Sequence, residues 1–302
     1  MKLVEIAKSV GEHIVSGVRT IERGDLSNSE WAEFLETESE QTASSRLKRF
    51  ANEYDYTIRL VTMPFKPKGI AHDPQGIDDK IKQQTIGDGS KKVACLYDTV
   101  DGTWNAKAGQ SFTVSAMLAF TDEFENFPES YTIGDFTTAV IAPHFGHGLY
   151  LVENGNVPVF HGYQGRTERL RLTEETDPTN IRCMIDTFTA PTKEARARAN
   201  RIILGIMDEW ADFGRYFGSG VELMAMLGRS NTDPAYGGYV SANQKTDNII
   251  PGSIILRNQG AVITDWHGNP IISRNLGERV DVVIAANSPL HERLVYHTER
   301  GY

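Results

Sequence analysis

The sequence predicts an α/β (α+β) fold, and three observations lead to this class. Apolar residues recur at helical spacing near the start of the chain, which predicts a pair of packing helices over 2–21 and 39–54. Short β-branched and apolar runs follow, and the turn residues between them are typical of an antiparallel sheet. Beyond residue 181, strands and helices alternate. We therefore expect one structural unit built from two halves, 1–180 and 181–302.

The composition limits the class of protein. The 302 residues are 40% hydrophobic and 24% charged, which is typical of a globular protein with a sizeable core. The formal net charge of −9 argues against nucleic acid as the main partner, because binding a phosphate backbone needs a basic surface. A small phosphorylated substrate stays possible, because a bound metal ion supplies local positive charge.

Cysteine usage and hydropathy bear on the compartment. Cys95 and Cys183 lie in apolar runs, so we expect buried free thiols in a reducing, cytoplasmic compartment. Runs of eighteen or more apolar residues are absent, which predicts no membrane span. Charged residues interrupt the first helix, so we expect no signal-peptide core there.

Apolar residues on one helical face define the first helix, and they are Leu3, Ile6, Val10, Ile14, Val18 and Ile21. Polar residues at 27–29 break the pattern before it resumes over 39–54. Glu38 stands just before the expected start of the second helix, where acidic residues are favoured in any protein. A strand is expected over 56–63, followed by a loop rich in proline and glycine.

The most informative stretch follows a short apolar run that predicts a buried strand over 93–97. Asp98 and Asp101 come directly after it, and Gly102 follows at once. Two carboxylates at a strand end can face one hard cation, and Mg²⁺ prefers oxygen ligands of this kind. A sharp turn at Gly102 exposes backbone N–H groups that can meet an anion. The alternative interpretation is a polar turn without chemistry.

The remaining elements follow from the same patterns. Apolar alternation predicts further strands over 112–120, 137–142, 148–152 and 157–160. In the second half we expect strands over 181–186, 213–217, 236–240, 261–264 and 280–286. Helices are expected over 192–213, 218–227 and 249–259, and after Ser288. His144 and His147 lie near a strand end, where a zinc pair is conceivable but surface or turn histidines are far more common.

The segment Tyr97–Asn105 resembles the signature of the inositol monophosphatase superfamily, Asp-Pro-Ile/Leu-Asp-Gly-Thr-x-Asn-Phe/Ala. Three later segments, 218–223, 246–252 and 259–268, resemble further motifs of that superfamily in the same order. The resemblance implies a layered α-β-α-β-α sandwich of the sugar phosphatase type, with the site between the halves. It also implies a homodimer and a Mg²⁺-dependent phosphatase that uses two or three ions.

The resemblance assigns roles residue by residue. Asp88, Asp98 and the carbonyl of Val100 would hold a first Mg²⁺, and Asp98, Asp101 and Asp247 a second. Thr103 would orient the attacking water together with Glu38. The remaining assignment is phosphate binding, by Gly102, Thr103, Gly218 and Ser219. Simpler interpretations stay open, since Asp88 suits an ordinary turn and Asp247 an ordinary helix N-terminus.

Departures from the superfamily pattern define the alternatives. Asp88 is shorter than the usual glutamate, Gly89 replaces a second glutamate, and Thr246 replaces a tryptophan. The expected activity is hydrolysis of a phosphate monoester of a small polyol or sugar. Val240 stands where inositol monophosphatases carry a glutamate, so inositol phosphate is not specifically favoured. The alternatives are a degenerate member that binds a phosphorylated ligand without turnover, a phosphoadenosine phosphate phosphatase, and a structural subunit.

Overall fold

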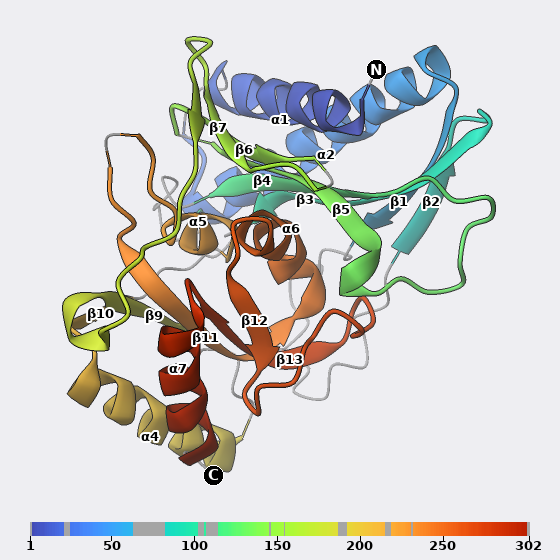
Figure 1. Ribbon diagram of the computed structural model, residues 1–302. Coiled ribbons are helices and arrows are strands. Elements are labelled where there is room, and N and C mark those ends of the chain that lie inside the picture. The colour runs from blue at the N-terminus through green and yellow to red at the C-terminus, as the bar shows by residue number, and fades with distance from the viewer. Residues whose placement is uncertain are drawn as a thin grey trace.

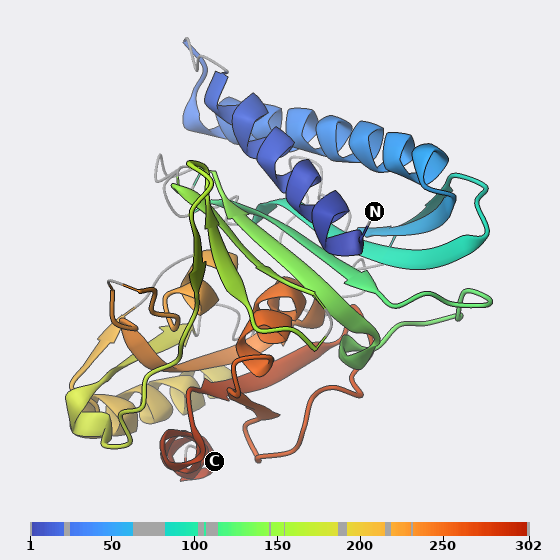
Figure 2. The ribbon, with the colours of Figure 1, turned by 45° about the horizontal axis from the view of Figure 1, so that its top comes forward.

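The computed structural model describes residues 2–20, 25–62, 82–101, 106, 114–144, 146–153, 155–186, 192–214, 219–230 and 232–300. These residues form five layers, helix–sheet–helix–sheet–helix, which Figure 1 shows from top to bottom and Figure 2 from a second angle. The layered α-β-α-β-α sandwich expected from the resemblance is therefore confirmed.

The first layer is a helix pair, α1 (Leu3–Thr20) and α2 (Asn28–Glu53). Beneath it lies an eight-stranded sheet in the order β2-β1-β3-β4-β5-β6-β7-β8. Its strands are β1 (Tyr56–Thr62), β2 (Lys82–Ile86), β3 (Lys91–Asp101), β4 (Ser115–Thr121), β5 (Phe136–Pro143), β6 (Gly148–Val152), β7 (Val159–Gly162) and β8 (Thr167–Arg169). The β1–β3 pair is parallel and the other neighbours are antiparallel.

The middle layer holds α5 (Ser219–Met224) and α6 (Thr246–Arg257). Next comes a mixed sheet in the order β10-β9-β11-β13-β12. Its strands are β9 (Arg182–Asp186), β10 (Asp212–Gly214), β11 (Tyr236–Lys245), β12 (Val262–Asp265) and β13 (Arg279–Ala285). The outer helices α4 (Lys193–Glu209) and α7 (Ser288–Arg300) cover its far face (Figure 1).

Three buried apolar clusters fill the spaces between the layers. The first joins α1 and α2 to the eight-stranded sheet, the second joins both sheets to α5 and α6, and the third joins the five-stranded sheet to α4 and α7. Neighbouring residues of β3 belong to different clusters, since Cys95 faces α1 and α2 while Leu96 faces α6. The even-numbered positions of β3 before residue 98 therefore face the middle layer.

The second helix begins earlier than the sequence analysis expects. Ser27 caps α2, accepting a hydrogen bond from the Glu30 N–H at 3.3 Å, while the Ser27 N–H donates to Glu30 Oε2 at 3.0 Å. This Ser-x-x-Glu capping box starts a helix that runs without a break to Glu53. The expected start at residue 39 is wrong, because the polar residues at 27–29 form a helix cap.

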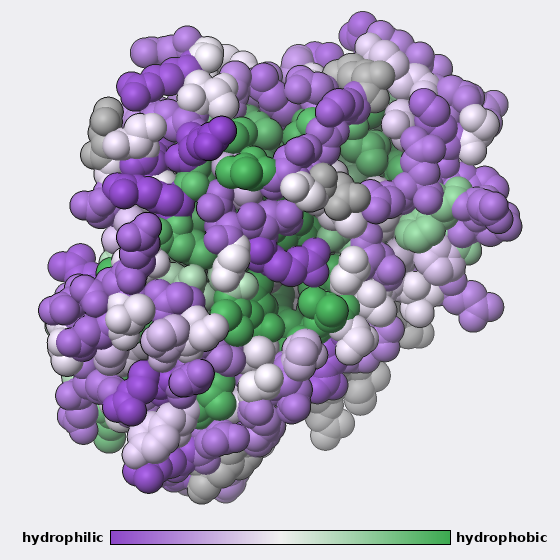
Figure 3. All heavy atoms as spheres, viewed as in Figure 1, coloured by the Kyte–Doolittle hydropathy of each residue, from purple (hydrophilic) through white to green (hydrophobic). Residues whose placement is uncertain are grey.

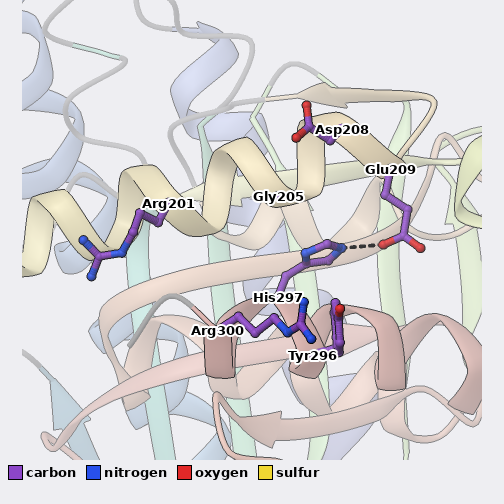
Figure 4. Close-up of a pocket in the computed structure, with 7 residues that line it drawn as sticks. All are labelled: Arg201, Gly205, Asp208, Glu209, Tyr296, His297 and Arg300. Atoms are coloured by element: carbon purple, nitrogen blue, oxygen red, sulfur yellow. Dashed lines mark hydrogen bonds and ion pairs between the residues drawn. The ribbon is translucent and has the colours of Figure 1, made fainter.

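The outer helices meet through a charged contact near the end of the chain. Gly205 on α4 lies so close to α7 that an added Cβ would stand 2.7 Å from His297 Nδ1. Glu209 accepts a hydrogen bond from Arg293 Nε at 2.6 Å and pairs with His297 (Figure 4). A cavity of about 340 Å³ lies beside this contact.

One face of the molecule shows how hydrophilic and hydrophobic residues are distributed over it. Figure 3 shows hydrophilic residues over most of one face, with hydrophobic residues visible in its hollowed middle. In the described part of the chain, none of the helices combines the length and apolar character that crossing a bilayer needs.

Candidate functional site

The end of β3 carries two of the predicted site residues on an irregular stretch of strand. Asp98 pairs with Met117 of β4 and Asp101 pairs with Ser115, so three steps on β3 match two steps on β4. In a regular strand, residues three apart point to opposite faces of the sheet. The extra residue is a β-bulge, which re-aims the side chain that follows it. Asp98 and Asp101 can therefore face the same layer.

Asp101 is held by the first turn of α5. The N–H of Gly220 donates to Asp101 Oδ2 at 2.7 Å, and Asp101 is buried. An added Cβ at Gly220 would stand 2.7 Å from both Met117 Sδ and Ser115 Oγ. A larger residue here would force the Met117 and Ser115 side chains of β4 to move, so glycine allows the close approach of α5.

Asp247 comes from the first turn of α6 and is also buried. The start of this helix is fixed by Thr246, whose hydroxyl donates to the Asn275 carbonyl at 3.1 Å and accepts from the Gly277 N–H at 2.9 Å. A helix N-terminus favours a negative charge, so this position suits a carboxylate.

The pKa of Asp98 responds to the charges of three other carboxylates. Burial raises the pKa of Asp98 well above its ordinary value, and the charges of Asp101, Asp247 and Glu36 raise it further. A hydrogen bond from the Val100 N–H to Asp98 Oδ1 at 3.0 Å acts in the opposite direction. We call Asp98, Asp101, Asp247 and Glu36 the acidic cluster.

Glu36, which the sequence analysis missed, is the residue of α2 that affects Asp98. Glu38 lies inside α2, about 200° around the helix from Glu36, so Glu36 rather than Glu38 is the acid of α2 whose charge acts on Asp98. One turn further on, the charge of Glu40 acts on Tyr97, and burial together with this charge raises the pKa of Tyr97 to about 12. The capping box at Ser27 was the signal that could have placed this helix face correctly.

The structure does not bring Asp88 to the acidic cluster. Asp88 is exposed in the turn between β2 and β3, and this turn is held to the start of β1 through the Gly89 N–H and the Tyr56 carbonyl. Asp98 lies seven residues beyond Lys91, the first residue of β3, which corresponds to about 23 Å of extended strand. The place of Asp88 before the start of β3 does not favour a shared ion with Asp98, and its assignment as a ligand stays a prediction.

Several predicted residues cannot be placed. Gly102, Thr103 and Gly218 lie outside the described residues, and Ser219 is described only as the first residue of α5. Val100 is described, is buried, and lies within the bulge. The roles assigned to these residues remain predictions.

The acidic cluster fits Mg²⁺ by its chemistry. Its side chains offer only carboxylate oxygens, the ligands that this hard ion prefers, and a cation would relieve the repulsion that raises the pKa of Asp98. Within the described residues, no three Asp, Glu, His or Cys side chains stand close enough to enclose an ion as they are. This open arrangement is compatible with Mg²⁺, which keeps several water ligands and is usually held by one or two carboxylates.

The two histidines of the sequence analysis point to different environments. His147 is exposed, whereas His144 is fully buried after β5 with its Nε2 3.1 Å from the Thr99 carbonyl oxygen. Burial lowers the pKa of His144 to about 4, so its ring is neutral at pH 7.

The fold and the acidic cluster together define a class, a layered α/β sandwich with carboxylates at the end of an interior strand and at a helix N-terminus. No family model matches the sequence, and no curated protein matches it. Solved structures do. SuhB of Mycobacterium tuberculosis aligns with a TM-score of 0.68 and 13% identity over 99% of this chain and 96% of that chain.

Two further structures agree. Inositol monophosphatase II of Staphylococcus aureus aligns with a TM-score of 0.68 and 14% identity over 99% of this chain and 94% of its own. The extragenic suppressor protein SuhB of Bartonella henselae has a TM-score of 0.66 and 15% identity over 99% and 98%. The protein therefore has the fold of the inositol monophosphatase superfamily, and the resemblance seen in its motifs is confirmed at the level of the fold.

Proposed function

We propose that the protein is a Mg²⁺-dependent phosphatase that hydrolyses a phosphate monoester of a small polyol or sugar. The observation that supports this proposal is that the charges of Asp101 and Asp247 both raise the pKa of Asp98, in a fold shared with inositol monophosphatases. These residues come from two elements that are far apart in the sequence, the β3 bulge and the α6 N-terminus.

Each residue has a part in the proposed mechanism. Asp98, Asp101 and Asp247 would hold Mg²⁺, two or three ions in all, which supplies a water of lowered pKa and positive charge for the phosphate. The Gly220 N–H keeps the Asp101 carboxylate in one orientation. Glu36 takes the place that the sequence analysis gave to Glu38. The parts of Val100, Gly102, Thr103, Gly218 and Ser219 are proposed as the sequence predicts them.

The experiment is phosphate release from a panel of sugar, inositol and nucleotide monophosphates and phosphoadenosine phosphate, with Mg²⁺, with chelator, and with Li⁺ added to Mg²⁺. We expect release that depends on Mg²⁺, with sugar or polyol phosphates preferred. Preference for phosphoadenosine phosphate would replace the substrate class and keep the reaction. The same release with chelator would contradict the metal-dependent mechanism.

A second candidate is a protein that binds a phosphorylated ligand without hydrolysing it. The position of Asp88 favours it, because the acid expected to complete a first metal site is exposed in the turn before β3, whereas Asp98 lies near the other end of that strand. Binding of Mg²⁺ and a sugar phosphate without phosphate release from any member of the panel would favour this candidate.

Assembly and location are proposed with the function. A homodimer follows from the resemblance, and analytical ultracentrifugation at several protein concentrations would test it. A cytoplasmic location agrees with Cys95 and Cys183, which are both buried free thiols. Localisation of the tagged protein in its own cell would test that.

A further inference from the structure

We propose that His144 is a positioning residue that orients the peptide between Thr99 and Val100 and so fixes the Asp98 carboxylate for metal binding. This inference rests on the proposed function, because it assumes that Asp98 holds Mg²⁺. It concerns a residue that no motif of the sequence includes.

The bulge creates the need for such a residue. Thr99 and Val100 lie between the Asp98–Met117 and Asp101–Ser115 pairs, where the ladder between β3 and β4 is shifted. A buried carbonyl that leaves a ladder costs free energy unless another donor replaces the lost one. His144 Nε2 stands 3.1 Å from the Thr99 carbonyl oxygen and supplies that donor.

A single peptide unit connects His144 to Asp98. The carbonyl of Thr99 accepts from His144, and the N–H of Val100, which belongs to the same planar peptide, donates to Asp98 Oδ1 at 3.0 Å. Because the peptide is rigid, the donor that holds the Thr99 carbonyl also fixes the direction of the Val100 N–H. The same hydrogen bond opposes the rise in the pKa of Asp98, so it favours the charged carboxylate that a metal ion needs.

The hydrogen-bond partners define the state of the ring. A carbonyl oxygen can only accept, so Nε2 must carry the hydrogen. Nδ1 is then the bare nitrogen, and it is buried without a hydrogen-bond partner among the described residues. The neutral ring that burial enforces is therefore present in one tautomer, with its donor aimed at Thr99.

His144 is itself held in place from two sides. Its N–H donates to the Val114 carbonyl at 2.9 Å, just before β4. Arg19, in the last turn of α1, donates from Nε to the His144 carbonyl at 2.9 Å and from its other end to the Gly146 carbonyl. The Arg19 guanidinium also lies 4.9 Å above the Tyr163 ring. A path of hydrogen bonds thus runs from Arg19 through His144 to Asp98.

The test uses matched variants and measures Mg²⁺ binding by calorimetry, separately from turnover. His144→Leu removes the donor, His144→Gln restores an N–H at similar reach, and His147→Leu changes an exposed histidine three residues away. Residues that support metal ligands typically change affinity by about 10–100-fold when they are lost. We expect His144→Leu to weaken Mg²⁺ binding about tenfold, His144→Gln to recover most of it, and His147→Leu to leave it unchanged.

A milder variant covers a failure of His144→Leu to fold. Arg19 is exposed, so Arg19→Met should fold, and releasing the turn after β5 should weaken Mg²⁺ binding about two- to threefold. Wild-type affinity in folded His144→Leu, or in Arg19→Met if His144→Leu does not fold, would overturn this inference alone. Equal losses in the leucine and glutamine variants would overturn it as well, because they would show a role in packing. Absence of Mg²⁺ binding by the wild-type protein would overturn the proposed function, and this inference with it.

Discussion

Asp98 and Glu209 are both partly buried, and their pKa values move in opposite directions. Burial would raise the pKa of Glu209, but the hydrogen bonds from His297 and Arg293 outweigh it, so the pKa of this carboxyl lies below its ordinary value. At Asp98 burial and three neighbouring carboxylates act together and raise the pKa. In the contact between α4 and α7, positively charged Arg293 pairs with Glu209, as expected for an acid that stabilises the fold. The acidic cluster contains only negatively charged side chains, as expected for acids that bind a cation from solution.

The largest expected effect comes from removing one charge of the acidic cluster. Asp98→Asn should lower Mg²⁺-dependent phosphate release at least about a thousandfold, because charge stabilisation by a bound metal is worth several kcal/mol. It should also raise the melting temperature of the metal-free protein, since a repulsive buried charge is lost. Kinetics with the preferred substrate and thermal melting in chelator are the measurements.

Asp88→Asn is the matched control for that variant. Asp88 is exposed and lies at the opposite end of β3, so we expect unchanged turnover and Mg²⁺ affinity. Loss of turnover in Asp88→Asn comparable to that in Asp98→Asn would show that the sequence-based assignment of Asp88 was right.

The next effect concerns stability in acid. The pKa of His144 is about 4 in the folded protein and about 6.5 in an unfolded chain, so the unfolded chain binds the proton first as pH falls. The stability present above pH 6.5 is therefore lost as pH falls toward 4, by up to about 3 kcal/mol. Urea unfolding of the wild-type protein and of His144→Gln between these pH values measures it. The same slope in both proteins would assign the loss to other groups.

The smallest effect belongs to the contact between the outer helices. Glu209→Gln should lower the free energy of unfolding by about 1–2 kcal/mol, a value reduced by the half-exposed Arg293. Because the pKa of Glu209 is lowered on folding, its contribution is present above the ordinary pKa and is lost as pH falls through the folded value. Mg²⁺ affinity should not change. A change in the Mg²⁺ affinity of Glu209→Gln would contradict the view that Glu209 acts in stability alone.

Sequence patterns predicted the α/β class, and the resemblance of the motifs implied the five layers and pointed to Asp98, Asp101 and Asp247. Asp98, Asp101 and Asp247 follow from ordered motifs and from a strand end, features that local residue types define. The position of Asp88 could not be judged in this way, because ten positions along the chain can mean one turn or the full length of a strand. The bulge depends on the register between β3 and β4, and no pattern within β3 records it.

The contribution of α2 was open to a better prediction. Ser27 with Glu30 forms a recognisable capping box, which would have placed Glu36 and Glu38 inside one helix that begins at Asn28. The role of His144 could not have been predicted from the sequence. Its role depends on a carbonyl that lies 45 positions earlier in the chain and on a ladder that is shifted there.

The hydrogen bond between Gly220 and Asp101 also bears on the order of events during synthesis. The two residues are 119 positions apart, and Arg19 and its partner His144 are 125 positions apart. At about 5–20 residues per second, roughly 6–25 s pass between the synthesis of the first and the second residue of each pair. During that interval the N-terminal helices and the first strands lack the middle layer and must stay soluble without it. The proposed Mg²⁺ site would therefore form late in synthesis. A truncated nascent chain would carry Asp98 and Asp101 without Asp247.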